Sequence, residues 1–250
     1  MSTTIAIATG GIMVVKKAIK VPRHRTRRAP KKIAFGQRTL TRIKSALPKL
    51  KRTAKLYADR HEAEADTRLL VVDTLEALGW DQGTDLTGET RVRGDAMDFA
   101  LSLKGDAVAA IEVKSSSVNL AERHLRQVEK YSADSGFEWM ILTNGNQWQL
   151  YHLTYNRPLV VDLIATVDLF GDARPSVLAE EFAIFSKESF VKNFVGTKWE
   201  TRIATSPEQL RSVLFSKEVV NAFRKQLRRK SGQLLPLDET VRILRDWLKV

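Results

Sequence analysis

Three ionisable residues that lie close together in the sequence, Asp98, Glu112 and Lys114, have the types and spacing of a divalent-metal site. Asp98 lies in an apolar, strand-prone run at residues 96–103, and the other two lie in a similar run at residues 107–114. The Gly-Asp pair between the runs supplies turn residues, so the segment is predicted to form a β-hairpin. Because side chains two apart on a strand share a face, the carboxylate of Glu112 and the ammonium of Lys114 lie side by side.

The register of this hairpin decides whether Asp98 joins them. A three-residue loop at 104–106 places Asp98 opposite Glu112, whereas a two-residue loop at 105–106 pairs it with Val113 and turns it to the other face. We expect the three-residue loop. Two facing carboxylates repel each other unless a cation lies between them, and oxygen ligands suit Mg²⁺ or Mn²⁺. The alternative is a solvated sheet edge with ordinary surface charges.

The elements on either side of the hairpin repeat a simple order. An amphipathic helix is predicted to begin at Glu64, and a second helix at 120–132 places Gln127 and Tyr131 on one face. An apolar strand from Trp139, an Asn-Gly turn at 144–145 and another strand follow. The order is therefore helix, hairpin, helix, hairpin, and the expected buried stripe of the first helix is Leu69, Val72, Leu75 and Leu78.

Six motifs in this order resemble the N-terminal nuclease domain of the type I restriction enzyme R (motor) subunit, a member of the PD-(D/E)xK nuclease superfamily. The resemblance extends from about residue 61 to about residue 164. A single motif of this kind occurs by chance in many strands, but six in the family's order are specific. The proline that often precedes Asp98 is absent. The motifs are Glu64 with Thr67-Arg68, Leu78-Gly-Trp80, Asp98, Glu112-Val-Lys114, Gln127-x-x-x-Tyr131 and Thr143-Asn-Gly145.

The resemblance implies a fold and a set of roles. The fold would be a restriction-endonuclease-like mixed β-sheet flanked by helices, of the α/β class. Asp98 and Glu112, with the carbonyl of Val113, would hold Mg²⁺ (or Mn²⁺), and Lys114 would orient or deprotonate the attacking water. Glu64 would complete the metal site directly or through water.

Two further residues receive roles from the resemblance alone. Gln127 and Tyr131 would support the site or contact the DNA backbone. Each of the helical residues has a simpler interpretation: Glu64 as an acid that favours the positive end of its helix, and Tyr131 as a core residue.

The length and the motifs limit what can be transferred from the family. A chain of 250 residues cannot hold the two ATPase lobes of an R subunit, and it contains no G-x-x-x-x-G-K-[ST] run. We therefore expect a nuclease module without a motor and without a nucleotide triphosphate. DNA is the expected partner, with a homodimer or restriction-system subunits as further possibilities.

Positive charge is concentrated at the N-terminus. The net charge is +12, and residues 1–60 contain 17 of the 41 Lys and Arg residues but one of the 29 acids. Residues 1–58 are predicted to form a basic, largely disordered leader that binds nucleic acid in a salt-sensitive way. A solubilising tail, a membrane-surface anchor, an organellar presequence or a start at Met13 remain alternatives. The expected nucleic-acid-binding residues are Arg23, Arg25, Arg27, Arg28, Lys31 and Lys32.

Other functional classes find little support in the sequence. The chain contains no cysteine, and its four histidines fall in different segments without ligand spacing, which argues against disulfides and zinc sites. The apolar run at 5–15 has no positive residues before it and is too short to span a bilayer. We expect a cytoplasmic location.

The last third of the sequence looks structural. Residues 59–200 are assigned to the nuclease-like domain and residues 201–250 to a helical C-terminal extension. A capping box at 206–209 predicts a long helix to about Lys230, and a last helix at 238–249 is expected to bury Val241, Leu244 and Trp247. Covering the core is the favoured role of these helices. A dimer interface, or presentation of Arg224, Arg228, Arg229 and Lys230 to DNA, is the alternative.

Together these features predict a metal-dependent DNA endonuclease. The competing hypothesis is a nucleic-acid-binding or assembly module that retains the nuclease fold and does not cleave. A third hypothesis, an RNA-binding protein that uses the fold as a passive scaffold, rests on the basic leader alone.

Overall fold

A computed structural model describes residues 32–60, 63–92, 95–121, 124, 136–155 and 159–249. The predicted DNA-contacting residues of the leader up to Lys31 lie outside these ranges, and so do Gln127 and Tyr131. Lys32 is described and is exposed.

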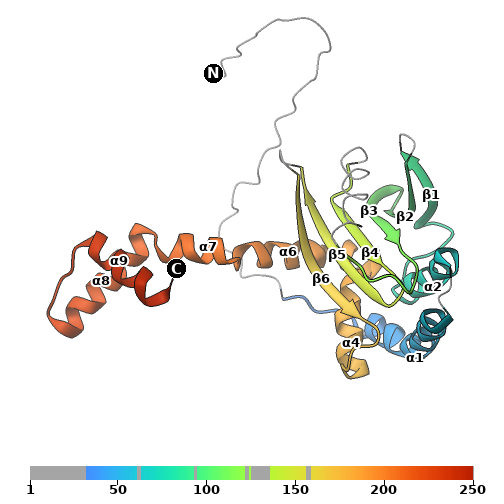
Figure 1. The fold of residues 1–250 in the computed structure, drawn as a ribbon, viewed down its shortest axis with the longest axis horizontal. Coiled ribbons are helices and arrows are strands. Elements are labelled where there is room, and N and C mark those ends of the chain that lie inside the picture. The colour runs from blue at the N-terminus through green and yellow to red at the C-terminus, as the bar shows by residue number, and fades with distance from the viewer. Residues whose placement is uncertain are drawn as a thin grey trace, which may run out of the picture. The chain divides into compact units, whose positions relative to one another are not determined.

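The centre of the fold is one mixed sheet of six strands in the order β1-β2-β3-β4-β5-β6 (Figure 1). Strands β3 and β4 are parallel, and every other neighbouring pair is antiparallel. The predicted mixed α/β sheet is therefore confirmed. The strands are β1 (Leu86–Val92), β2 (Asp95–Leu103), β3 (Asp106–Val113), β4 (Trp139–Thr143), β5 (Gln147–Thr154) and β6 (Val160–Asp168).

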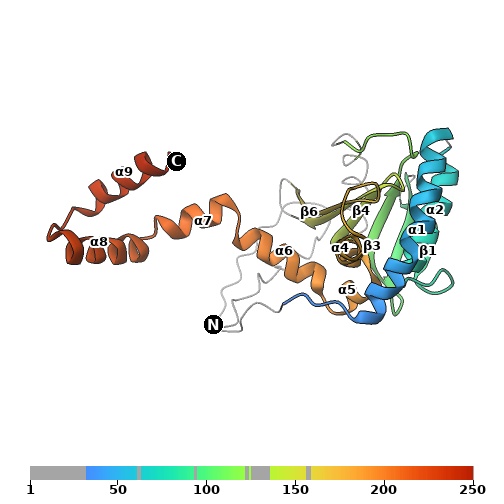
Figure 2. The ribbon, with the colours of Figure 1, turned by 90° about the horizontal axis from the view of Figure 1, so that it is seen from below.

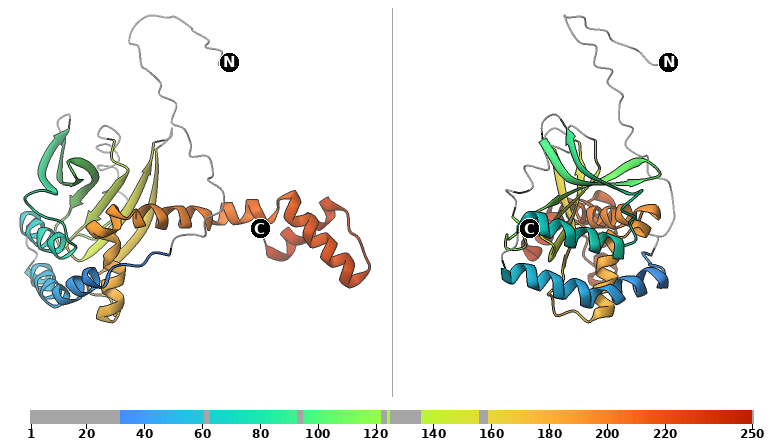
Figure 3. Two further views of the ribbon diagram at one scale, coloured as in Figure 1. Left: turned by 180° about the vertical axis from the view of Figure 1, so that it is seen from behind. Right: turned by 90° about the vertical axis from the view of Figure 1, so that its right-hand side faces the viewer.

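Helices cover one face of this sheet and enclose the main core. In Figures 2 and 3, α1 (Gln37–Arg60) and α2 (Glu64–Ala77) lie side by side, and α2 contacts β3. The core combines Ile111 and Val113 of β3 with apolar side chains of α1 and α2. The remaining elements around it are α4 (Pro175–Phe182), the 3-10 helix η1 (Ala183–Phe185), α5 (Lys187–Val191) and α6 (Phe194–Ala204).

Helix α1 corrects the predicted boundary of the basic leader. Residues 37–58 were expected to lack structure, but they form a helix of 24 residues with Arg60 at its end. The physical reason is an apolar repeat that the high charge conceals, because every third or fourth residue is buried in the core. The buried residues are Thr39, Ile43, Leu47, Leu50 and Ala54.

Helix α2 begins at Glu64, as predicted, but the predicted buried stripe is wrong at two positions. Leu69 is 63% exposed and Val72 is half-buried, whereas Leu75 and Leu78 are buried as expected. The residues that α2 buries include Thr67, Leu70, Val71 and Thr74. Compared with the predicted orientation, α2 is rotated about its axis, so that Thr67 and Thr74 rather than Leu69 face the neighbouring elements.

The β2–β3 hairpin has the predicted register, but a different turn produces it. Leu103 pairs with Asp106, so the turn contains only Lys104 and Gly105, both at positive φ. Such a turn matches the twist of paired strands. A β-bulge after Leu101 then shifts the pairing by one residue, which gives the Phe99–Ile111 pair. Extending this register by one residue puts Asp98 opposite Glu112.

The C-terminal helices differ from the prediction in two ways. The expected long helix is divided into α7 (Pro207–Leu214) and α8 (Lys217–Ser231), because Ser216 caps a new helix after Ser206 has capped the first. The final helix, α9 (Leu237–Leu248), buries only Thr240 and leaves Trp247 77% exposed. Since α8 buries only Val220, the expectation that these helices cover the core is wrong.

The predicted boundary at residue 200 falls inside α6. This helix is attached to the sheet by Trp199, whose ring stacks on His152 of β5 with 3.7 Å between ring centroids. The indole N–H of Trp199 also donates to Asp162 of β6 at 3.3 Å. Residues 201–204 therefore continue a helix that belongs to the sheet domain.

No helix in the described ranges is long and apolar enough to cross a membrane.

Candidate active site

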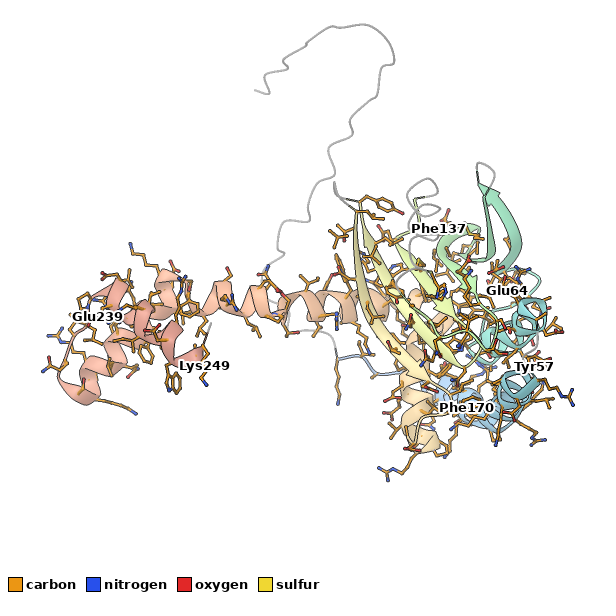
Figure 4. All side chains as sticks on the ribbon, in the orientation of Figure 1. Tyr57, Glu64, Phe137, Phe170, Glu239 and Lys249 are labelled. Atoms are coloured by element: carbon orange, nitrogen blue, oxygen red, sulfur yellow. The ribbon has the colours of Figure 1, made fainter. Side chains whose placement is uncertain are left out.

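The candidate site lies where the first turn of α2 meets β2 and the end of β3. Asp98 comes from β2, Glu112 from β3 and Lys114 from the residue directly after β3, while Glu64 and Arg68 come from α2. Figure 4 labels Glu64 at the start of α2, beside the strands of the hairpin. Segments of the chain that are nearly fifty residues apart therefore meet at this point.

Asp98 is held by two donors. Its carboxylate accepts a 2.7 Å hydrogen bond from the backbone N–H of Val113, which ties β2 to the end of β3. Its other oxygen forms an ion pair with the guanidinium of Arg68. The Asp98 side chain is 7% exposed, so the carboxylate is fixed in an almost dry environment.

Glu112 and Lys114 form the second pair of the site, and their side chains lie on one side of the chain as predicted. Lys114 Nζ donates to Glu112 Oε1 at 2.5 Å, and the two side chains are 15% and 4% exposed. Burial raises the pKa of Glu112 above its ordinary value, the Lys114 contact opposes that shift, and the charges of Asp98 and Glu64 raise the pKa further. The negative charges of Asp98 and Glu64 therefore disfavour the ionised form of the buried Glu112 carboxyl.

Glu64 stands at the exposed edge of the site. Its side chain is 42% exposed, and Arg68 Nη2 lies 3.3 Å from Glu64 Oε1. Arg68 itself is 32% exposed and links Glu64 to Asp98. Exposure thus decreases from Glu64 through Arg68 to the two strand carboxylates, so solvent reaches the site from the side of α2.

Three polar contacts fix the chain that follows β3. Thr67 Oγ1 of α2 accepts from the N–H of Ser116 at 3.1 Å, and Asn144 Nδ2 donates to the Val118 carbonyl at 2.8 Å. The N–H of Lys114 donates to the Thr143 carbonyl of β4 at 2.8 Å. Motif residues Thr67, Thr143 and Asn144 therefore position Lys114 and the loop beyond it.

The structure also shows how far the site matches a metal centre. Within the described ranges, no three His, Cys, Asp or Glu side chains come close enough together to hold a metal ion. The carboxylates of Asp98 and Glu112 lie near enough to interact electrostatically. Glu64 is connected to Asp98 through Arg68, which pairs with both carboxylates. Arg68 is the site residue that sequence reasoning overlooked, because it was recognised as part of a motif but received no chemical role.

Comparison with known proteins gives one match. Residues 82–164 match the family described as type I restriction enzyme R protein N terminus, and this segment contains β1 to β5 and the first part of β6. The matched segment contains Asp98, Glu112 and Lys114, whereas Glu64 and Arg68 precede it. No curated protein matches the chain. No solved structure matches it either.

Proposed function

We propose that this chain, whose residues 82–164 match the family described as type I restriction enzyme R protein N terminus, is a divalent-metal-dependent endonuclease that hydrolyses DNA phosphodiester bonds. The observation that carries the proposal is the meeting of two buried carboxylates and a lysine, Asp98, Glu112 and Lys114, at the end of one hairpin. The family match supports a nuclease-related role in a restriction system.

The donor chemistry fits Mg²⁺ or Mn²⁺. Asp98, Glu112 and the Val113 carbonyl offer only oxygen ligands, which hard divalent cations prefer. Burial raises the pKa of Glu112, the charges of Asp98 and Glu64 add to that rise, and a bound cation would favour the ionised carboxylate. A bound divalent ion would polarise the scissile phosphate and lower the pKa of a water molecule.

The chain's own residues would divide the remaining work. The Lys114 ammonium, which Glu112 holds in place, would orient the attacking water and stabilise negative charge on the phosphate. The Val113 N–H fixes the Asp98 carboxylate, so its geometry is set before a substrate arrives. Glu64 would contact the metal through water.

Arg68 gives the site two possible states. In this structure it is bonded to Asp98 and Glu64, so a metal that binds Asp98 must displace the guanidinium from that oxygen. Once released, Arg68 would lie at the exposed edge of the site, where it could bind a DNA phosphate.

The ion pair formed by Arg68 also favours a second candidate function. With Arg68 on Asp98 and Lys114 on Glu112, both buried carboxylates have a cationic partner without a metal. A nucleic-acid-binding or assembly module that retains the fold and does not cleave would need only this arrangement. Its partners would be DNA and restriction-system subunits, and a cytoplasmic location fits either function.

A plasmid-nicking assay separates the two functions. Purified protein is incubated with supercoiled DNA and Mg²⁺, beside Asp98→Ala and Lys114→Ala variants. Lys104→Ala serves as the control, because Lys104 lies on the same hairpin but in the exposed turn. Nicking by the parent and the control alone supports the endonuclease. Equal background in all four proteins would leave the non-cleaving module.

A further inference from the structure

Helix α1 carries an unusual charge pattern for a helix that packs in a core. Eight of its 24 residues are Lys or Arg, and Asp59 is its single acid. Its apolar stripe is buried, so its cations project from the remaining surface. Exposed helix faces commonly mix both signs, since a glutamate four residues before a lysine stabilises a helix. Helix α1 lacks such pairs.

Two of the α1 cations have partners inside the fold. Arg42 Nε donates to the Ala77 carbonyl of α2 at 2.8 Å, and Lys49 Nζ pairs with Asp73 of α2 at 2.7 Å. Both contacts point toward α2 and help to hold the two helices together. These two cations are therefore structural.

Four other cations of α1 form a group that we call the basic surface: Lys44, Lys51, Arg52 and Lys55. None of the four forms an ion pair with an acid among the residues that the structure describes. Lys51 and Lys55 are four residues apart, a spacing at which like charges destabilise a helix. The fold thus tolerates an electrostatic cost that a bound anion would remove.

The basic surface leads toward the candidate site. Helix α1 ends at Arg60 and α2 begins at Glu64, so the two residues are at most about 14 Å apart along the chain. Glu64 is part of the site, and Lys55 lies little more than one helical turn before Arg60. We therefore expect a rod of negative charge that follows α1 toward its C-terminal end to come near Glu64, at the exposed edge of the site.

We propose that the basic surface binds the sugar–phosphate backbone of duplex DNA and holds the duplex against the candidate site. The proposal rests on the proposed nuclease function and lies outside the segment that matches the family. An anionic membrane is less suitable as the partner, because the apolar stripe of α1 is buried in the core and cannot enter a bilayer surface. Backbone contacts of this kind give affinity without sequence preference.

The test compares two variants with the same number of charges removed. In one, the four residues of the basic surface are changed to glutamine. In the control, the same change is made at four exposed cations of the helices that follow the sheet, Arg202, Arg211, Lys217 and Lys225. Binding of a fluorescein-labelled duplex is measured in EDTA, where cleavage cannot interfere, over a range of salt concentrations.

The basic-surface variant is expected to bind DNA more weakly and with a flatter salt dependence. Each lost phosphate contact reduces the slope of log affinity against log salt by about 0.9, so four contacts reduce it by about 3 to 4. A Lys51→Gln, Lys55→Gln double variant should lose about half as much. It provides a second measurement in case the fourfold variant folds poorly.

Three results would overturn the proposal. The first is an unchanged slope and affinity in the folded basic-surface variant, and the second is an equal loss in the control variant. The third is a loss of binding to phosphatidylserine vesicles, measured on the same variant, without a loss of DNA binding. Failure of the nuclease proposal is distinguishable, because a protein that binds DNA through α1 but never nicks it retains this surface. Conversely, if the parent nicks DNA and the basic-surface variant binds DNA as well as the parent does, the nuclease proposal stands and the basic-surface proposal fails.

Discussion

Replacing Arg68 by leucine should make the protein less stable without metal and tighter in binding metal. Among the residues that the structure describes, Arg68 and the Val113 N–H donate to an Asp98 side chain that is 7% exposed. In Arg68→Leu one oxygen of a buried carboxylate loses its cation. The same loss removes the competitor that a metal must displace.

The magnitude follows from the burial of the pair. Removing one partner of a fully buried ion pair costs about 3 to 5 kcal/mol. Because Arg68 is 32% exposed and the Val113 N–H remains, we expect a cost below this range, of about 2 kcal/mol. For a chain of this size that corresponds to a melting temperature about 4 to 8 °C lower. The same free energy no longer opposes the metal, so the Kd for Mg²⁺ should fall about 30-fold.

Two measurements check this prediction. Thermal unfolding in EDTA gives the loss of stability, and calorimetric titration of the folded protein with Mg²⁺ gives the Kd. Lys49→Leu is the matched control, because it removes a cation from an exposed partner on α2, Asp73, and should change the metal affinity of neither carboxylate. Unchanged stability in EDTA together with equal or weaker metal binding in Arg68→Leu would refute the reasoning.

Three further predictions concern the stability of the fold. Because the pKa of Glu112 is raised in the folded protein, ionisation of this carboxyl opposes folding. The free energy of unfolding is therefore unaffected by Glu112 below its ordinary pKa of 4.5, and it falls as the pH rises from there through the raised pKa of the folded state. Glu112→Gln should therefore gain stability relative to the parent as pH rises, and a difference that stays constant with pH would contradict this. Trp148→Ala removes a fully buried ring and should lower the free energy of unfolding in urea by about 3 to 5 kcal/mol. A loss below about 0.5 kcal/mol, as for a surface substitution, would contradict this. Gly145→Ala should cost about 1 to 2 kcal/mol, because Gly145 has φ 82° and a Cβ would lie 2.9 Å from Leu70 Cδ2; an unchanged unfolding midpoint would mean that the turn adapts.

The strands around the site could be predicted from sequence because short-range patterns determine them. Alternating or continuous apolar runs with turn residues between them gave β2, β3, β4 and β5, and Asn144-Gly145 gave the turn between the last two. Strand β1 was missed because its sequence, LTGETRV, is polar and contains a glycine. Edge position and pairing with β2, rather than propensity, account for this strand.

The register of Asp98 was predicted correctly for the wrong reason. Sequence patterns favour a turn at the Gly-Asp pair, but the observed turn uses Lys104 in a left-handed conformation and a bulge then restores the register. The bulge depends on how β2 and β3 pack, which no local pattern encodes. The same limitation explains α2, whose rotation about its axis depends on contacts with the sheet and α1.

The predictions failed in opposite ways at the two ends of the described chain. In α1 the buried stripe was present in the sequence, but the surrounding lysines and arginines suggested disorder. In α9 a regular apolar stripe suggested burial, yet Trp247 is 77% exposed. An amphipathic pattern shows which face could be buried and does not identify the surface that buries it.

The central claim is that Asp98 and Glu112 together hold one divalent ion, and Mn²⁺ binding measured by electron paramagnetic resonance tests it most directly. The parent protein should bind a single Mn²⁺ ion that Mg²⁺ displaces, and an Asp98→Asn variant that remains folded should lose this binding. Equal Mn²⁺ binding by the parent and by folded Asp98→Asn would contradict the account, and so would a parent that binds no ion.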